Sequence, residues 1–479
     1  MPMMLDQDLS PAKRSLLALR LKQRKPVARD VSIQPRPRRE GSNRFPLSIA
    51  QEGIWFLDRL TRGNAALNMP AVVHITGPLN KPVLRKALQE VIRRHEILRT
   101  HIRTESQGPV QIAVPDLDLV IEETNLLSLP SEAHEAEIIR QAERQAQQEF
   151  DLSVLPLFKV RLIQINTDEH ALIFILHHII ADGWSVGVLI QELNTLYRAF
   201  LMQTPSPLHP LPLQYGDFSW WQHGVAGNSK LMREFTYWKH ELRNGVPVLK
   251  MDLDHSRGGT RSFKGATQRF WLSPQLKQRL AALAVQSNST LFMVLFSAFA
   301  MVIFRCSHQT HFAIGTDVAG RNHSALEKLI GVFTNQLVIR CDLDGNPGFT
   351  EIVSRLKTKL LNAYAHQELP FEKLVAGLQI SRDSAQSPLF RVKFVMPNIP
   401  LPELDFPGMS ARFLELNPGS TKFDLTLFLE EIGGGLRVSA EYNSSSFDAY
   451  AIQTLFALFE ETLTTVTINS NIALKSMVA

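Results

Sequence analysis

The chain has 479 residues, of which 44% are hydrophobic, and a formal net charge of +5. Single cores rarely grow beyond about 250–300 residues, so this length predicts at least two. The modest charge, without a nucleic-acid-binding module, argues against a nucleic-acid partner. The two cysteines, Cys306 and Cys341, are too few for a disulfide framework and indicate a reducing, cytoplasmic location.

Membrane insertion and secretion are not expected. The first residues, MPMMLDQDLS, lack the basic-then-apolar pattern of a signal peptide. The longest apolar stretch, residues 291–304, is interrupted by Ser297 and is shorter than the roughly 18 residues that a span needs. It predicts a buried helix. No metal-ligand spacing and no glycine-rich phosphate loop are found, so neither a metal nor a bound cofactor is expected.

The first 44 residues differ from the rest in composition. A short helix is expected within residues 1–29, where Ser10 and Pro11 suit its start. Residues 24–40 are basic with scattered prolines, which is typical of a linker. Two interpretations stay open: an unstructured lead-in, or a contact for a preceding carrier protein or for acidic phosphates. The folded part is predicted to begin at Phe45.

A first folded region, residues 45–225, mixes helices and strands. It opens on SIAQEGIWFL at residues 48–57. An amphipathic helix at 81–97 runs into RHEILRT, where His95 and Glu96 are interpreted as charges tying the helix to a sheet. Further elements are expected as strands at 72–75, 110–114 and 117–121 and a polar helix at 131–150.

A hairpin and a helix frame the most informative stretch. Residues 158–165 and 170–176 are predicted to pair across a turn, the second strand being apolar and buried (ALIFIL). Residues 185–201 have the spacing of an amphipathic helix. Between them, residues 177–183 have the sequence HHIIADG. Loops held by rigid elements commonly carry catalytic groups.

The residue types in this loop suit acyl transfer. His177 and His178 titrate near neutral pH and can accept a proton from a nucleophile. Asp182 can fix the loop by pairing with an arginine, and Gly183 allows a backbone angle that other residues avoid. With ordinary residue frequencies, H-H-x-x-x-D-G is expected by chance in roughly one chain in a thousand of this length.

A second region, residues 226–479, follows an aromatic stretch, YGDFSWW, at 215–221. Paired helices are predicted at 272–285 and 289–305, the second buried on all sides. Strands are predicted from 312, at 392–396, 425–431 and 436–442, and a closing helix at 447–464. Three further patterns lie among them: IGVFTNQLVIR at 330–340, HQELPFE at 366–372 and RDSAQSPLF at 382–390.

Together these patterns resemble the condensation domains of nonribosomal peptide synthetases, in family order from about Phe45 onward. The heptad alone is also similar to chloramphenicol acetyltransferase and its relatives. Gly53 departs from the first family motif, S-x-A-Q-x-R-L-W-x-L, so any role of that arginine is lost. Thr334, Gln336 and Glu368 are further departures, in the fifth and sixth motifs.

The resemblance implies an α/β fold with two chloramphenicol-acetyltransferase-like lobes in a V, and a tunnel between them. It implies that His178 lies next to the amine of the acceptor substrate, where it acts as a base or positions that amine. It favours a structural role for His177. Asp182 is expected to pair with Arg321, and Gly183 to leave room for a phosphopantetheine arm. The tunnel-lining candidates are Trp184, Ser185 and Asn335.

The implied activity is that of an amide-forming acyltransferase. It joins an acyl thioester to the amine of an aminoacyl group on an acceptor carrier protein. The substrates ride on phosphopantetheine or coenzyme A. Met1 and its natural-looking lead-in favour a starter domain that uses acyl-CoA; the alternative is an elongation domain with a donor bound to an upstream carrier protein.

Three other kinds of domain share this fold, and the sequence argues against each of them. An epimerase would need an acidic residue opposite the histidines, and its other motifs differ. A heterocyclising domain would replace the histidines by aspartates. A non-catalytic recruitment domain tends to lose the histidines, which are intact here.

Overall fold

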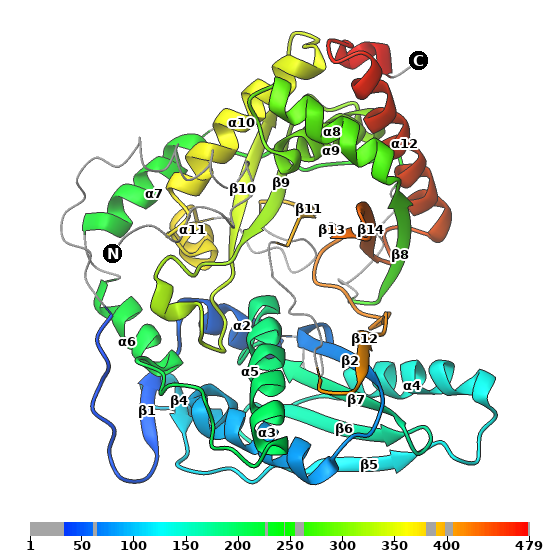
Figure 1. Cartoon of the computed structure of the whole chain (residues 1–479). Coiled ribbons are helices and arrows are strands. Elements are labelled where there is room, and N and C mark those ends of the chain that lie inside the picture. The colour runs from blue at the N-terminus through cyan, green and yellow to red at the C-terminus, as the bar shows by residue number, and fades with distance from the viewer. Residues whose placement is uncertain are drawn as a thin grey trace, which may run out of the picture.

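The computed structural model describes residues 33–60, 65–225, 229–243, 245–253, 263–379, 389–397 and 406–477. The helix predicted within residues 1–29 and most of the stretch 382–390 lie outside these ranges. Figure 1 shows a mixed α/β architecture in which the two halves of the chain lie one above the other.

The first half builds a sheet in the strand order β12-β2-β7-β6-β5 and a smaller sheet in the order β1-β4-β3. Its elements are β1 (Asn43–Pro46), α2 (Ile49–Leu60), β2 (Asn68–Thr76), α3 (Lys81–Arg94), β3 (Thr100–Glu105), β4 (Gly108–Ala113), β5 (Ile121–Asn125), α4 (Ser131–Ala146), β6 (Phe158–Gln164), β7 (Glu169–His177), α5 (Gly183–Leu201) and α6 (Tyr215–Val225).

The second half builds a sheet in the order β10-β9-β11-β13-β14-β8. Its elements are α7 (Ser229–Glu241), β8 (Gly265–Leu272), α8 (Pro274–Gln286), α9 (Leu291–Ser307), β9 (His311–Val318), β10 (Asn335–Asp342), α10 (Phe349–Ala365), α11 (Phe371–Gly377), β11 (Val392–Val395), β12 (Ser410–Phe413), β13 (Leu425–Ile432), β14 (Gly435–Asn443) and α12 (Ala449–Ile468).

Helix α9 lies at the centre of the second core, as its sequence predicts. Its side chains are apolar nearly all round, so burial on every side stabilises it, and α8, α10 and α12 pack against it. Within the described residues no single helix is long and apolar enough to cross a membrane. The helices α8 and α9, which meet at an angle of 102°, would together satisfy the length and composition expected of a membrane span, and nothing else supports one.

The predicted hairpin is confirmed. Strands β6 and β7 pair antiparallel from Phe158 opposite Leu176 to Gln164 opposite His170. Strand β7 is buried along nearly its whole length because both neighbours and helices cover it. A fully buried strand is rigid, and it delivers the histidine loop to a fixed place.

The structural interpretation of His95 and Glu96 is confirmed, with a different partner for the helix. His95 Nε2 lies 3.0 Å from Glu192 Oε2 on α5, which also binds Arg94 at 3.0 Å, so α3 is tied to a helix and not to the sheet. Glu96 instead accepts from Arg38 at 2.9 Å. Residues 33–39, expected within the linker, therefore contact the first half.

Two other expectations are wrong. The strand expected at 117–121 begins only at Ile121; β5 leaves most of its side chains exposed, so the more apolar residues before it gave a misleading signal. Gly183 does not adopt an unusual backbone angle. It lies in the first turn of α5 and is absent from the positive-φ glycines among the described residues.

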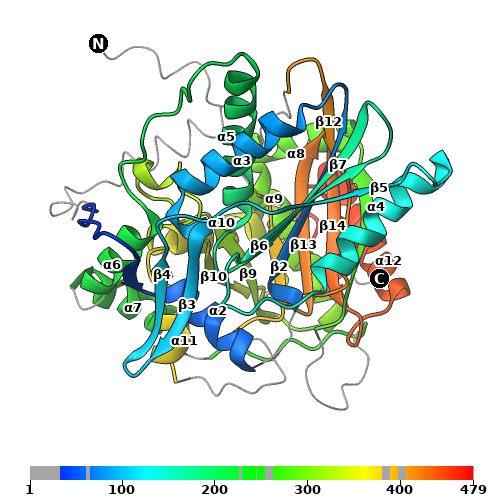
Figure 2. The same ribbon diagram turned by 90° about the horizontal axis from the view of Figure 1, so that it is seen from below.

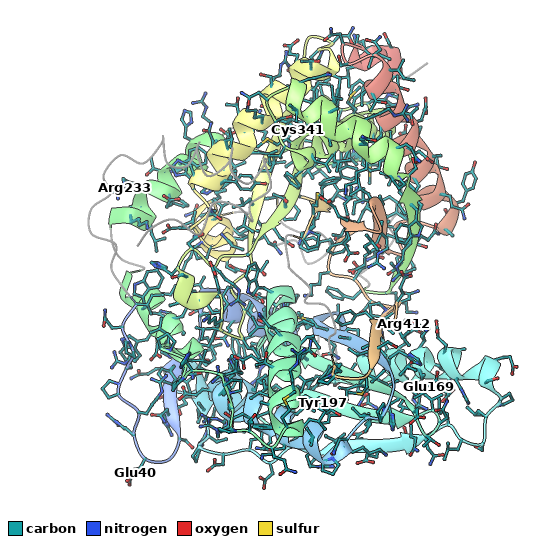
Figure 3. The ribbon with its side chains drawn as sticks, in the orientation of Figure 1. Glu40, Glu169, Tyr197, Arg233, Cys341 and Arg412 are labelled. Carbon is teal, nitrogen blue, oxygen red and sulfur yellow. The ribbon has the colours of Figure 1, made fainter. Side chains whose placement is uncertain are left out.

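Strand β12 was not predicted and crosses between the halves. It leaves the second half and pairs antiparallel with β2, from Ser410 opposite Thr76 to Phe413 opposite Val73. It is the edge strand of the first sheet, with β2 as its neighbour, and Figure 2 shows this sheet from below. Arg412, labelled in Figure 3, binds Glu135 of α4 at 2.5 Å from this strand. The first sheet is therefore completed by the second half.

Candidate functional site

The histidine loop is fixed at both ends by its flanking elements. His177 is the last residue of β7, and Asp182 is the N-cap of α5. The Asp182 carboxylate accepts the Ser185 N–H at 2.9 Å, and the Asp182 N–H donates to Ser185 Oγ at 3.3 Å. This capping box sets where the helix starts. The loop between is held further by the His178 N–H, which donates to the Leu67 carbonyl at 2.8 Å.

The predicted pairing of Asp182 with Arg321 is confirmed. Arg321 Nη2 lies 3.0 Å from Asp182 Oδ1, and both side chains are almost fully buried. The Phe333 N–H donates to the other carboxylate oxygen at 3.0 Å, and Arg321 also donates to the Leu329 carbonyl at 2.7 Å. Burial acts to raise the pKa of Asp182, but Arg321 and the N–H donors outweigh it, so the pKa lies below its ordinary value. The ion pair joins the second half to the histidine loop.

One ring nitrogen of His178 is hydrogen-bonded within the loop itself. Its Nδ1 lies 2.8 Å from the Ala181 carbonyl, so Nδ1 carries the proton and Nε2 keeps its lone pair. The side chain is partly exposed. Burial, followed by the charge of Lys422, lowers the pKa of His178 to about 3. The imidazole is therefore neutral at pH 7, and its Nε2 can accept a hydrogen bond.

His177 is enclosed, in agreement with a structural role. It is 2% exposed, and its Nδ1 accepts the Ile179 N–H at 3.2 Å, so its proton is on Nε2. That nitrogen lies 3.9 Å from Asp58 of α2, and the Phe150 ring packs edge-on at 5.9 Å. Burial lowers the pKa of His177 to about 3 as well.

Three further residues were predicted to line a substrate passage. Ser185 is 1% exposed and its Oγ accepts the Gly331 N–H at 3.0 Å, so the prediction that it lines a passage is wrong. Asn335 holds the turn at 367–371, donating to the Gln367 and Leu369 carbonyls at 2.8 Å each. Trp184 is partly exposed and donates to the Glu327 carbonyl at 2.9 Å. For Asn335 and Trp184, a position on a substrate passage stays a prediction.

Sequence reasoning missed the side chains that brace the loop from behind. Gln51 of α2 donates to the Ile179 carbonyl at 3.0 Å, and Ser48 Oγ lies 2.7 Å from the Tyr215 hydroxyl. Tyr215 in turn donates to the Val332 carbonyl at 2.8 Å. All three side chains are buried. The pattern at 48–57 held the signal, because buried serine and glutamine need specific partners.

Gly320 allows Arg321 to reach the loop, which gives a stability prediction. Its φ is +66°, and an added Cβ would lie 1.8 Å from the Phe333 carbonyl oxygen. Gly408 has φ +70° but open space around it. We expect Gly408→Ala to cost about 1 kcal/mol for the left-handed backbone alone. Gly320→Ala should cost about 1–3 kcal/mol more, because a backbone group must move. Urea unfolding of both variants measures the difference; equal losses would show that the contact relaxes freely.

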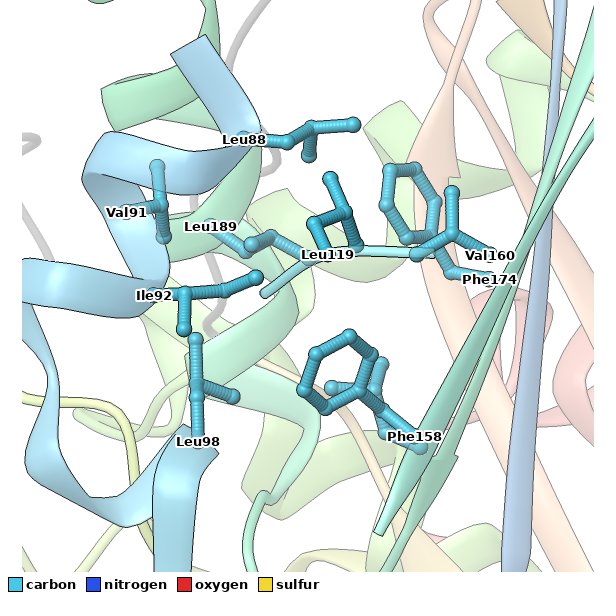
Figure 4. Close-up of a pocket in the computed structure, with 10 residues that line it drawn as sticks. Leu88, Val91, Ile92, Leu98, Leu119, Phe158, Val160, Phe174 and Leu189 are labelled. Atoms are coloured by element: carbon cyan, nitrogen blue, oxygen red, sulfur yellow. The ribbon is translucent and has the colours of Figure 1, made fainter. Parts of the chain in front are cut away.

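A small cavity in the first core is not a binding site. Figure 4 shows it between α3, α5 and the sheet, lined by apolar side chains such as Leu88, Phe158 and Leu189. Its volume is about 20 Å³, room for roughly one water. It offers no polar partner to a ligand, and the partly exposed His178 remains the candidate centre.

The comparison with known families identifies the chain. The model of the condensation domain matches residues 42–478. The chain is a condensation domain. It belongs to the family found in nonribosomal peptide synthetases, as the motifs had indicated.

Relatives support this assignment. The condensation domain is 40% identical over 413 residues to chondramide synthase cmdD of Chondromyces crocatus, covering 86% of this chain and 10% of that protein. It is 36% identical over 428 residues to a linear gramicidin synthase of Brevibacillus parabrevis, covering 89% of this chain and 8% of that protein. It therefore spans about a tenth of the length of these relatives.

A solved structure confirms the predicted fold. The condensation domain from monacolin K polyketide synthase MokA superposes with a TM-score of 0.79 at 20% identity, covering 91% of this chain and all of that one.

Proposed function

We propose that this condensation domain forms an amide between an acyl thioester and the amine of an aminoacyl group carried on an acceptor carrier protein. The observation that carries the proposal is His178, a partly exposed residue in a fixed loop, whose Nδ1 is engaged by the Ala181 carbonyl so that Nε2 is left as the acceptor. An α-amine has a pKa near 7.7–8.0, so a sizeable fraction is already unprotonated and nucleophilic at neutral pH. The site has to hold two reactants and manage one proton.

In the proposed step the amine nitrogen attacks the thioester carbon. A C–N bond forms, the C–S bond breaks, and the thiol leaves with the proton that the amine gives up. His178 accepts a hydrogen bond from the attacking N–H and orients its lone pair towards the carbon. Because its pKa is low, we favour this positioning role over storage of a full proton. No metal or bound cofactor is part of the proposal, since phosphopantetheine or coenzyme A carries the substrates.

For the donor we propose an acyl-CoA, which makes this a starter domain that N-acylates the first amino acid. The alternative is a donor bound to an upstream carrier protein. Both donors present a thioester on the same pantetheine arm, so the histidine loop serves either. The two donors differ outside the site, because a carrier protein must dock on the surface of the domain and coenzyme A brings no such protein.

A donor competition tests the proposal. The purified domain is mixed with an aminoacyl carrier protein and with either an acyl-CoA or the same acyl group on a carrier protein, and the products are analysed by mass spectrometry. We expect N-acylated aminoacyl carrier with acyl-CoA. Product from the carrier-bound donor alone would reject the starter role and keep amide formation. No product from either donor, across a panel of amino acids and acyl chains, would reject both.

A further inference from the structure

A buried chain of hydrogen bonds connects the histidine loop with the second half through the start of α2. Gln51 Nε2 donates to the Ile179 carbonyl at 3.0 Å, and the Gln51 N–H donates to Ser48 Oγ at 3.1 Å. Ser48 Oγ lies 2.7 Å from the Tyr215 hydroxyl, which donates to the Val332 carbonyl at 2.8 Å. Gln51, Ser48 and Tyr215 are each at most 1% exposed. We call these three side chains the bracing network.

The direction of each hydrogen bond in the bracing network is fixed. A carbonyl oxygen cannot donate, so the single hydroxyl proton of Tyr215 is used on Val332, and Ser48 must donate to Tyr215. Burial raises the pKa of Tyr215, which keeps that proton on the hydroxyl. The Ser48 N–H donates to Gln51 Oε1 at 2.9 Å, so the amide NH₂ group is directed at Ile179. Removing one hydroxyl therefore leaves buried partners unpaired, and they must move to find others.

At its other end the network holds the segment of the second half that binds Asp182. The Tyr215 ring packs directly on Gly331, because a Cβ added to that glycine would lie 2.0 Å from the ring. The same ring packs edge-on against Phe333, with 5.1 Å between the ring centroids. The Gly331 N–H donates to Ser185 Oγ at 3.0 Å. The Phe333 N–H donates to the Asp182 carboxylate at 3.0 Å. Tyr215 thus determines where these two donors lie.

The network therefore reaches the histidine loop at two points. Gln51 holds the carbonyl of the residue after His178. Tyr215 acts on Asp182 through the second half. The Ala181 carbonyl, which lies 2.8 Å from His178 Nδ1, is between these two points in the sequence. Loosening either point would let that carbonyl move, and the imidazole would turn with it.

We propose that Tyr215 is a positioning residue for the reaction: through the bracing network, its hydroxyl holds the imidazole of His178 in one orientation towards the attacking amine. The inference rests on the proposed amide-forming function. Tyr215 is 1% exposed, so it acts through the loop and not by contact with a substrate. Misplacing a reacting group by about 1 Å can lower a rate about 10²-fold. A buried hydroxyl can therefore control the rate of amide formation.

The test removes the hydroxyl and keeps the ring. We expect Tyr215→Phe to lower kcat about 10–100-fold, because the imidazole is no longer held in place. KM should stay within about 3-fold, because an interaction that aligns the reacting groups acts on the transition state and not on substrate binding.

Tyr197→Phe is the matched control. Tyr197 is also a buried tyrosine of the first half, and its hydroxyl accepts the Asn80 N–H at 2.9 Å. It lies 14 residues after Gly183, the first residue of α5, which is about 21 Å along the helix (Figure 3). Both substitutions remove one buried hydroxyl, so urea unfolding should show similar losses of stability. Only Tyr215→Phe should lower kcat, and this difference separates positioning from stability.

A second readout does not depend on turnover. Nitrogen-15 NMR of the His178 ring shows which nitrogen carries the proton. We expect the Nδ1-protonated form in the unmodified domain and in Tyr197→Phe, and a mixture of both tautomers in Tyr215→Phe, where the hydrogen bond to the Ala181 carbonyl is weakened. Ser48→Ala interrupts the same network and takes the place of Tyr215→Phe if that variant does not fold by circular dichroism. The double variant should lose no more rate than Tyr215→Phe, because both changes act through one network.

The outcomes distinguish the positioning role from the function. A kcat of Tyr215→Phe within about 3-fold of the unmodified domain, with His178→Ala still impaired, rejects the positioning role and keeps amide formation. Equal losses of kcat in Tyr215→Phe and Tyr197→Phe reject it as well. An unmodified domain that forms no amide rejects the function, and unchanged His178 signals in Tyr215→Phe reject the positioning role on their own.

Discussion

Replacing His178 by alanine is expected to reduce amide formation by about 10²–10⁴-fold, the range typical of a lost proton-handling group. The variant should fold normally, because within the described residues the side chain makes one hydrogen bond, to the Ala181 carbonyl, and it is not part of the hydrophobic core. Single-turnover formation of the amide on the carrier protein measures the loss. His209→Ala, an exposed histidine in the same half, is the control and should keep full activity.

Two further results bear on this prediction. Undiminished turnover of His178→Ala would mean that the site does not use the imidazole. A wild-type domain that binds its partners without forming product would favour a recruitment role.

The rate of amide formation, measured as a function of pH, should not fall with a midpoint near 6.5 on account of His178, because the pKa of this residue is lowered to about 3.

The histidines also make stability depend on pH. Both have a folded-state pKa near 3, below the ordinary value of 6.5, so the folded protein binds fewer protons than the unfolded chain. Their contribution is complete above about pH 6.5 and is lost as the pH falls from there towards 3.

Breaking the Asp182–Arg321 pair is expected to cause the largest loss of stability. Arg321→Met leaves the buried Asp182 carboxylate without its counter-charge, which typically costs about 3–5 kcal/mol. Urea unfolding at pH 7 measures it, and amide formation should fall together with stability because the loop loses its anchor. Adding Asp182→Asn in the same chain should recover part of the loss, since no unpaired charge then remains.

The matched control is an ion pair on the surface. Arg412 and Glu135 lie 2.5 Å apart, but each side chain is 56% exposed. Arg412→Met should cost at most about 1 kcal/mol. Losses of the same size in Arg321→Met and Arg412→Met would contradict the view that the buried pair fixes the histidine loop.

The sequence was informative where local pattern and local structure coincide. Strand β7 is buried on both faces, so its sequence is a continuous apolar run that predicts a buried strand. Helix α5 shows the spacing of an amphipathic helix. The pairing of Asp182 with Arg321 followed from a family resemblance and not from spacing, since 139 residues separate them. Resemblance supplied what no local pattern contains.

The missed features depend on tertiary contacts. Strand β12 has four residues, and only its pairing with β2 distinguishes it from a loop. Ser185 looked like a lining residue because it follows the loop, yet the capping box turns it inward.

The crossing of β12 sets a rule for recombination. A chimera that joins the first half of this domain to the second half of a relative would import a foreign edge strand into the sheet that supports His178. In such a chimera, residues 406–424 would have to come from the same protein as β2. The remaining part of the second half could then be exchanged without separating β12 from β2.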